Sequence, residues 1–183
     1  MTKIEITPAL TLFTAPVLPG CHSHRQAERE AVRRIIADVY GPEVEILHTP
    51  DGAPYLSGSR HLISVSHCHT TAGVLISTDG TRPGLDLETA DRTAQLTRVA
   101  PRFLTPTELP YWSSSPRRLL QAWTLKEAAF KAAGIPLADL RLIALDPDNK
   151  KTTLRGITLP VIRSEYLSEH VFMSVVVRYS LEP

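Results

Sequence analysis

The sequence has no excess of either charge and no long hydrophobic run. Its 20 Lys and Arg against 19 Asp and Glu give a formal net charge of +1 over 183 residues. Proteins that bind duplex nucleic acid or an anionic membrane by bulk charge carry a clear excess of Lys and Arg. The most apolar stretch, residues 171–177, is far too short to cross a bilayer as a helix. We therefore expect no nucleic-acid and no membrane partner, and any site for a polyanion must be local.

Cysteine is scarce as well. With two cysteines, Cys21 and Cys68, the chain cannot form the multi-bridge framework of a small secreted protein. Residues 1–7 lack the basic and apolar regions of a signal peptide, and they alternate like a β-strand. Both features predict a cytoplasmic protein with reduced thiols.

The nine glycines form neither a P-loop nor a Rossmann fingerprint, and no G-x-S-x-G element is present. Glycine-rich loops are the usual way in which a backbone holds phosphate groups. Any nucleotide must therefore be held by side chains and metal.

The apolar residues follow the periods of helices and strands. Residues 23–40 and 117–133 have helical spacing. Strands are expected at residues 44–48, 61–66, 71–77, 84–88, 157–163 and 171–179. A turn at residues 79–83 separates two halves, 1–80 and 81–183, each with strands and one main helix. This order predicts an α+β fold rather than alternating βαβ units.

Two carboxylates alternate in the predicted strand at residues 84–88. The period of a strand places Asp86 and Glu88 on one face, with Leu87 on the other. Paired carboxylates attract Mg²⁺, which prefers oxygen ligands and often shares them with substrate phosphates. The alternative is a solvated strand face without a metal.

The second predicted helix carries Glu127 and Lys131 one turn apart, on one face with Trp123. They could be a surface ion pair and nothing more. In the functional interpretation Glu127 supplies a third oxygen ligand or a general base, while Lys126 and Lys131 hold phosphate oxygens.

Further candidate phosphate ligands lie in the first half. The run Ser64-Val65-Ser66-His67 ends a predicted strand with hydroxyls and an imidazole, which can donate to phosphate or be structural. Arg25, Arg29 and Arg33 recur at helical spacing, and they form either a solvated face or a phosphate clamp.

Several of these elements, taken in order, resemble the 4′-phosphopantetheinyl transferases. They are Gly52-Ala53-Pro54, Ser64-Val65-Ser66-His67, Gly84-Leu85-Asp86-Leu87-Glu88, Arg102-Phe103-Leu104 with Glu108, and Trp123-Thr124-Leu125-Lys126-Glu127-Ala128-Ala129-Phe130-Lys131. The resemblance is to the two-lobed, monomeric class that modifies carrier proteins, and it covers roughly residues 25–134. It implies a pseudo-twofold pair of α+β lobes with coenzyme A in the cleft between them.

The resemblance also implies an activity: transfer of phosphopantetheine from coenzyme A to a serine of an apo-acyl or peptidyl carrier protein, with release of 3′,5′-ADP. Asp86, Glu88 and Glu127 would hold Mg²⁺, or alternatively Mn²⁺, and Glu127 would also deprotonate the serine. Lys131 would neutralise or protonate the departing bisphosphate, and Lys126 would hold the diphosphate.

For the cofactor, the resemblance assigns the 3′-phosphate to Ser66 and His67, and a further contact to Arg33. Many relatives have Lys or Arg where this chain has Ala53, so we expect Arg25, Arg29, Arg60 or His61 to supply the missing cation.

Carrier docking is expected at residues 102–118, where the apolar Phe103, Leu104, Leu109, Tyr111 and Trp112 alternate with arginines. Two other functions stay open. One is a relative that binds coenzyme A or a carrier without catalysis, and the other is a Mg²⁺-dependent phosphohydrolase.

Overall fold

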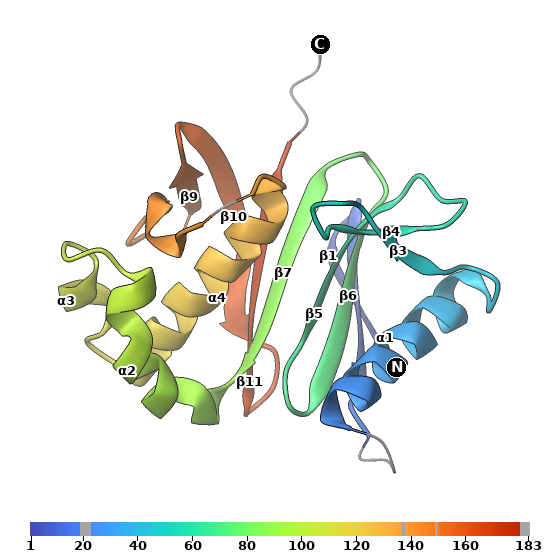
Figure 1. The fold of residues 1–183 in the computed structure, drawn as a ribbon, viewed down its shortest axis with the longest axis horizontal. Helices are drawn as coiled ribbons and strands as arrows, with labels where there is room; N and C mark the ends of the chain where they lie inside the picture. Colours follow the sequence, from blue (N-terminus) through green and yellow to red (C-terminus); the bar gives the residue numbers. More distant parts are fainter. Residues whose placement is uncertain (19–22, 137, 149, 180–183) are drawn as a thin grey trace.

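The protein folds into two antiparallel sheets that lie against each other, with helices on the outer sides of both (Figure 1). The structure is a computed structural model that describes residues 1–18, 23–136, 138–148 and 150–179. Strands and helices are not alternated in βαβ units, so the predicted α+β class is confirmed. Cys68 is a buried free thiol, while Cys21 lies outside the described residues.

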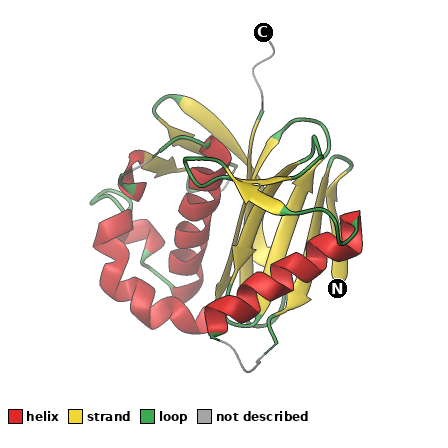
Figure 2. Cartoon of the chain, turned by 45° about the vertical axis from the view of Figure 1, so that its right-hand side comes forward, coloured by secondary structure: helices red, strands yellow, loops and turns green. Residues whose placement is uncertain are grey.

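The first sheet has the strand order β1-β2-β6-β5-β4-β3. Its strands are β1 (Thr2–Thr7), β2 (Leu10–Pro16), β3 (Ile46–His48), β4 (Pro54–Leu56), β5 (Leu62–His67) and β6 (Thr71–Ser77). Helix α1 (His24–Tyr40) crosses the outer face of this sheet (Figure 2). It buries Ala31, Val32, Ile35 and Ile36, which follow the predicted helical spacing.

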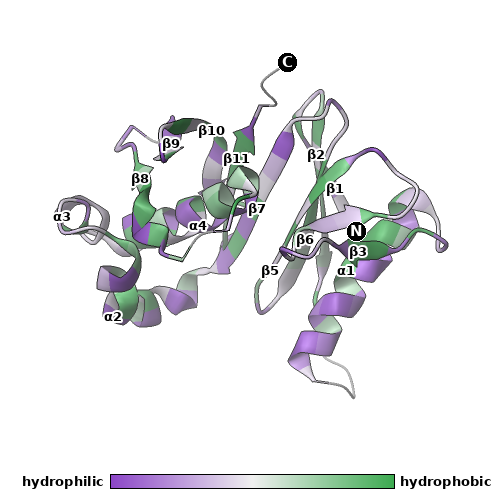
Figure 3. Cartoon of the chain, turned by 45° about the horizontal axis from the view of Figure 1, so that its top comes forward, coloured by the Kyte–Doolittle hydropathy of each residue, from purple (hydrophilic) through white to green (hydrophobic). Residues whose placement is uncertain are grey.

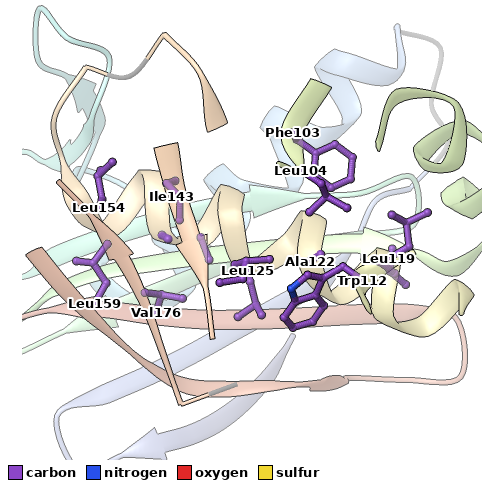
Figure 4. Packing of buried hydrophobic residues seen from close by; sticks show 14 of the residues in the cluster. Phe103, Leu104, Trp112, Leu119, Ala122, Leu125, Ile143, Leu154, Leu159 and Val176 are labelled. Atoms are coloured by element: carbon purple, nitrogen blue, oxygen red, sulfur yellow. The ribbon is translucent and has the colours of Figure 1, made fainter. Parts of the chain in front are cut away.

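The second sheet has the order β7-β11-β10-β9-β8. Its strands are β7 (Arg82–Thr89), β8 (Ile143–Leu145), β9 (Lys151–Leu154), β10 (Ile157–Tyr166) and β11 (Val171–Arg178). The helices α2 (Thr93–Phe103), α3 (Leu109–Trp112) and α4 (Pro116–Ala133) cover its outer face, together with the short 3-10 helices Ala90–Arg92 and Leu140–Leu142. Figure 4 shows this core, in which α4 packs between Leu104 and Val176.

The inner faces of the two sheets share a third core. Leu85 and Leu87 of β7 contribute to it from the second sheet, and Leu12 and Leu75 contribute from the first. Figure 3 shows the sheets side by side, with hydrophilic residues along α1. Burial of apolar surface therefore holds the two halves in one body.

Two serine hydroxyls join β5 to the free edge of β7. Ser64 Oγ accepts a hydrogen bond from the Leu85 N–H (2.9 Å), and Ser66 Oγ accepts one from the Leu87 N–H (3.0 Å). The other edge of β7 pairs with β11. Buried N–H groups need a partner, and at this junction side chains supply it.

The sequence did not predict β2, β4, β8 and β9. Three of these strands have only three or four residues, too few for a period to be recognised. The division at residue 80 and the pseudo-twofold relation stay predictions. No helix in the described part of the chain is long and apolar enough to span a membrane.

Candidate active site

The acidic cluster is built on the outer face of β7. Leu85 and Leu87 belong to the core between the sheets, so the alternate residues Gly84, Asp86 and Glu88 face α4. A Cβ at Gly84 would lie 2.0 Å from the Ala128 carbonyl oxygen. Glycine at this position therefore lets α4 lie directly on β7, which brings the helix face with Glu127 and Lys131 to the two carboxylates.

Asp86 is held from both halves of the chain. Its Oδ1 accepts hydrogen bonds from Ser66 Oγ (3.1 Å) and Lys131 Nζ (2.9 Å). Lys131 Nζ also donates to the Leu85 carbonyl (2.8 Å). Asp86 is 7% exposed, so the charge of Lys131 compensates a carboxylate that has lost most of its hydration.

Glu88 is paired with an arginine. Its Oε2 forms an ion pair with Arg92, and its Oε1 accepts the Thr89 N–H at 3.0 Å. Burial raises the pKa of Glu88, while the Thr89 N–H and Arg92 lower it and Asp86 raises it. Arg92 also lies over the Trp123 ring, 5.9 Å from its centroid.

Glu127 completes the cluster. Burial raises the pKa of its carboxyl group, and the charges of Asp86 and Glu88 raise it further, while Lys131 and Arg92 lower it. Three carboxylates thus share a poorly hydrated region, where like charges oppose one another. Such a region binds a cation or a proton readily.

The donor set fits a hard cation, because carboxylate oxygens are the ligands that Mg²⁺ prefers. Within the described ranges, however, no three His, Cys, Asp or Glu side chains are grouped so as to hold a metal ion. Asp86 is bonded to Lys131 and Glu88 to Arg92. A metal ion could therefore bind all three carboxylates only if the Lys131 and Arg92 side chains share Asp86 and Glu88 with it or move away from them.

A cavity of about 1100 Å³ opens beside this cluster, between α1, strands β3 to β5 and the end of α4. Its volume suits a nucleotide-sized ligand. Positive side chains from three elements line it: Arg25, Arg29, Arg33, Arg82 and Lys131. The cavity thus gathers positive charge locally, although the chain as a whole is nearly neutral.

His67 lines the same cavity. Its Nδ1 lies 3.1 Å from Glu28 Oε1, and the same oxygen lies 3.2 Å from His24 Nε2. A carboxylate at Nδ1 fixes the ring and leaves Nε2 for a ligand.

Arg82 was missed by the sequence reasoning. It begins β7, and its guanidinium lies over the end of α4, where a Cβ at Gly134 would come within 2.0 Å of Arg82 Cζ. Its position two residues before Gly84, at the start of the strand that carries Asp86 and Glu88, could have indicated that it lies near the site. Among the residues expected to replace a cation at position 53, Arg25 and Arg29 line the cavity. His61 does not line it, and its Nδ1 lies 2.7 Å from the Tyr40 hydroxyl.

The structure does not support the expectation that Lys126 holds phosphate. Its side chain is fully buried and forms an ion pair with Glu108 (2.9 Å). Lys126 Nζ also donates to the carbonyl oxygens of Leu140 (3.3 Å) and Ile143 (2.6 Å). Because neighbouring helix residues point about 100° apart, Lys126 faces the interior of the second half while Glu127 faces β7.

The expected phosphate contact of Ser66 is not supported either. Its hydroxyl is bonded to Asp86 and Leu87, and Ser66 does not belong to the lining of the cavity, although Ser64 and His67 do. Three of the expected docking residues are also unavailable, because Phe103, Leu104 and Trp112 are no more than 2% exposed (Figure 4).

Comparison with protein-family models gives a match. The family model described as "4'-phosphopantetheinyl transferase superfamily" matches residues 82–178, which is just over half of the chain. These residues include β7 with the acidic cluster and the whole of α4. A search of curated proteins found no match.

Proposed function

The chain belongs to the 4′-phosphopantetheinyl transferase superfamily, and we propose that it moves 4′-phosphopantetheine from coenzyme A to a serine of an apo-acyl or peptidyl carrier protein, releasing 3′,5′-ADP. One observation carries the proposal: Lys131, which is bonded to Asp86 of the carboxylate cluster, lines a cavity together with four arginines. Coenzyme A has a diphosphate and a 3′-phosphate. The carboxylate cluster with Lys131 suits the diphosphate with its metal ion, and the arginines of the cavity suit the 3′-phosphate.

The cavity offers separate places for the phosphates and the base of coenzyme A. Arg25, Arg29 and Arg33 present charged groups along α1, and His67 faces them from β5. Guanidinium groups bind phosphate oxygens in bidentate fashion. Val32 and Ile63 supply an apolar wall for the adenine, and Arg82 supplies a cation in the cavity that Ala53 also lines.

The reaction needs charge compensation, a base and positioning. Asp86, Glu88 and Glu127 would hold Mg²⁺, or alternatively Mn²⁺, which supplies neutralisation of the diphosphate. Glu127 takes the proton of the carrier serine as the serine oxygen bonds to the phosphorus that bears pantetheine. Burial raises the pKa of Glu127 above its ordinary value, which makes the carboxylate a stronger base. Lys131 reaches from α4 to the cavity and stabilises the 3′,5′-ADP oxygen as the P–O bond breaks.

Two alternatives make different predictions. A relative that binds coenzyme A without catalysis would bind the cofactor and modify no carrier. A phosphohydrolase would release phosphate from coenzyme A without any carrier. Carrier-dependent release of 3′,5′-ADP supports transfer and opposes both alternatives.

The arginines of α1 provide a prediction about cofactor affinity. Arg33→Glu is expected to weaken coenzyme A binding about tenfold or more, because a charge-assisted contact contributes about 1.5–3 kcal/mol and 1.4 kcal/mol is a factor of ten. Arg25→Glu and Arg29→Glu are expected to act in the same direction. Isothermal titration calorimetry measures the effect, and Arg98→Glu, an exposed α2 residue outside the cavity, is the matched control. Unchanged affinity in all three α1 variants would contradict the cofactor site.

We place carrier docking at a groove beside the start of α4. The groove has a volume of about 490 Å³, and Tyr111, Arg117, Arg118 and Arg163 contribute to its lining. Arg118 lies 4.3 Å from the Tyr111 ring centroid. Basic and aromatic side chains together suit an acidic helix of a partner.

Arg117→Glu combined with Arg118→Glu is expected to raise the KM for carrier about tenfold and to leave the affinity for coenzyme A unchanged, because neither residue lines the cofactor cavity. Steady-state kinetics with a fixed saturating concentration of coenzyme A measures this difference. Arg98→Glu combined with Arg155→Glu, at two exposed positions outside the groove, makes the same change in net charge and is the control. An unchanged KM for carrier would reject the docking site.

A further inference from the structure

Ser66 belongs to the first sheet, yet its hydroxyl is bonded to the acidic cluster of the second half. Ser66 Oγ donates to Asp86 Oδ1 (3.1 Å) and accepts from the Leu87 N–H (3.0 Å). Ser66 and Asp86 are 5% and 7% exposed, so this bond is shielded from water. A hydroxyl whose donor and acceptor sides are both used holds its carboxylate partner in one orientation.

Ser64 is a natural comparison within the same strand. It is 3% exposed, and its hydroxyl accepts the Leu85 N–H at 2.9 Å, as Ser66 does with Leu87. Both serines therefore make the same contact between β5 and β7. The difference is that Ser66 also donates to Asp86.

The two donors to Asp86 both use one oxygen. Ser66 and Lys131 donate to Oδ1, and among the described residues no hydrogen bond involves Oδ2. A carboxylate fixed in this way presents its second oxygen in a constant direction. Partners of this kind orient metal-binding carboxylates, and their loss typically lowers metal affinity about 10- to 100-fold.

We propose that Ser66 is a positioning residue that holds Asp86 through Oδ1 and keeps Oδ2 for a divalent cation, so that the first half of the chain takes part in metal binding. The proposal rests on the proposed function. It differs from a phosphate-binding role, because it gives Ser66 no contact with coenzyme A.

The test compares Ser66→Ala with Ser64→Ala, which lose the same strand contact. Coenzyme A is first titrated into each protein without metal, and Mg²⁺ is then titrated into each coenzyme A complex, both by calorimetry. We expect the metal-free affinity of Ser66→Ala for coenzyme A to be within about twofold of the wild type, and Mg²⁺ binding to be about tenfold weaker in Ser66→Ala alone. Because Ser64 lines the cavity, Ser64→Ala is the control for Mg²⁺ binding only. Ser66→Thr, which keeps the hydroxyl, is expected to restore Mg²⁺ binding. Thermal unfolding verifies that the variants are folded.

Equal Mg²⁺ affinity in Ser66→Ala and Ser64→Ala would overturn the proposal. Loss of metal-free affinity for coenzyme A in Ser66→Ala would also overturn it, and would assign Ser66 to the cofactor instead. A wild-type protein that binds neither coenzyme A nor Mg²⁺ would reject the proposed function itself, and the inference with it.

Discussion

Glu127→Gln is expected to lower carrier modification about a thousandfold and, at the same time, to stabilise the protein at neutral pH. The first effect follows because glutamine cannot accept the serine proton, and loss of a general base costs about 10²- to 10⁴-fold. The second follows because burial and the neighbouring carboxylates raise the pKa of Glu127 in the folded protein. Transfer rates and chemical denaturation at pH 7.5 measure the two effects.

The sign of the stability effect comes from proton linkage. The unfolded chain has the ordinary glutamate pKa of 4.5, and the folded protein has a higher one. Between these two values the folded state binds more protons, so the wild type loses stability as the pH rises through this window. Glutamine carries no charge, so the variant does not lose stability in this way. Its gain in the free energy of unfolding over the wild type is absent below pH 4.5 and complete above the pKa of Glu127 in the folded protein.

Glu30→Gln, at an exposed position of α1, is the matched control and should change neither property. Full activity of Glu127→Gln would contradict the role of Glu127 as base. A loss of stability at neutral pH would contradict the electrostatic description of the cluster.

Lys126→Met is expected to destabilise the protein by about 3–5 kcal/mol, the usual cost of removing one partner of a buried ion pair. Glu108 would be left buried without its counter-charge, and the carbonyl oxygens of Leu140 and Ile143 would lose their donor. Activity per folded molecule should stay within several-fold of the wild type, because Lys126 does not line the cavity. Urea denaturation and kinetics on the folded fraction measure the two properties.

Lys131→Met is the informative comparison, since it lies on the same helix and its side chain is 27% exposed. It should reduce activity strongly and stability less than Lys126→Met. Adding Glu108→Gln to Lys126→Met should recover part of the lost stability, because the unpaired charge disappears. If Lys126→Met removed activity but left stability unchanged, Lys126 would be a ligand contact after all.

Much of the site follows from periodicity in the sequence. The alternation of Asp86 and Glu88 predicted one strand face, and the spacing of Glu127 and Lys131 predicted one helix face; the structure brings these two faces together. The close approach of the two faces depends on Gly84, which has no side chain to collide with the backbone of Ala128. The sequence could not show this role, because the contact becomes visible only once α4 is placed.

Two predictions that the structure does not support assigned adjacent residues to one ligand. His67 lines the cavity, whereas the Ser66 hydroxyl is bonded to Asp86 and Leu87 of β7, and these partners become visible only once β7 is placed beside β5. On α4, neighbouring residues point about 100° apart, which separates Lys126 from Glu127. Apolar residues such as Phe103 and Trp112 were assigned to docking, although a sequence alone cannot show whether an apolar residue covers the core or a partner.

Intact-mass spectrometry of an apo-acyl carrier protein, incubated with this protein, coenzyme A and Mg²⁺, tests the central claim most directly. The account predicts a gain of one phosphopantetheine on the carrier serine, abolished by a chelator and by Asp86→Asn. Coenzyme A binding with no mass gain on acyl and peptidyl carriers of fatty-acid, polyketide and peptide synthases would contradict it. That result would instead identify a protein that binds the cofactor without transferring it.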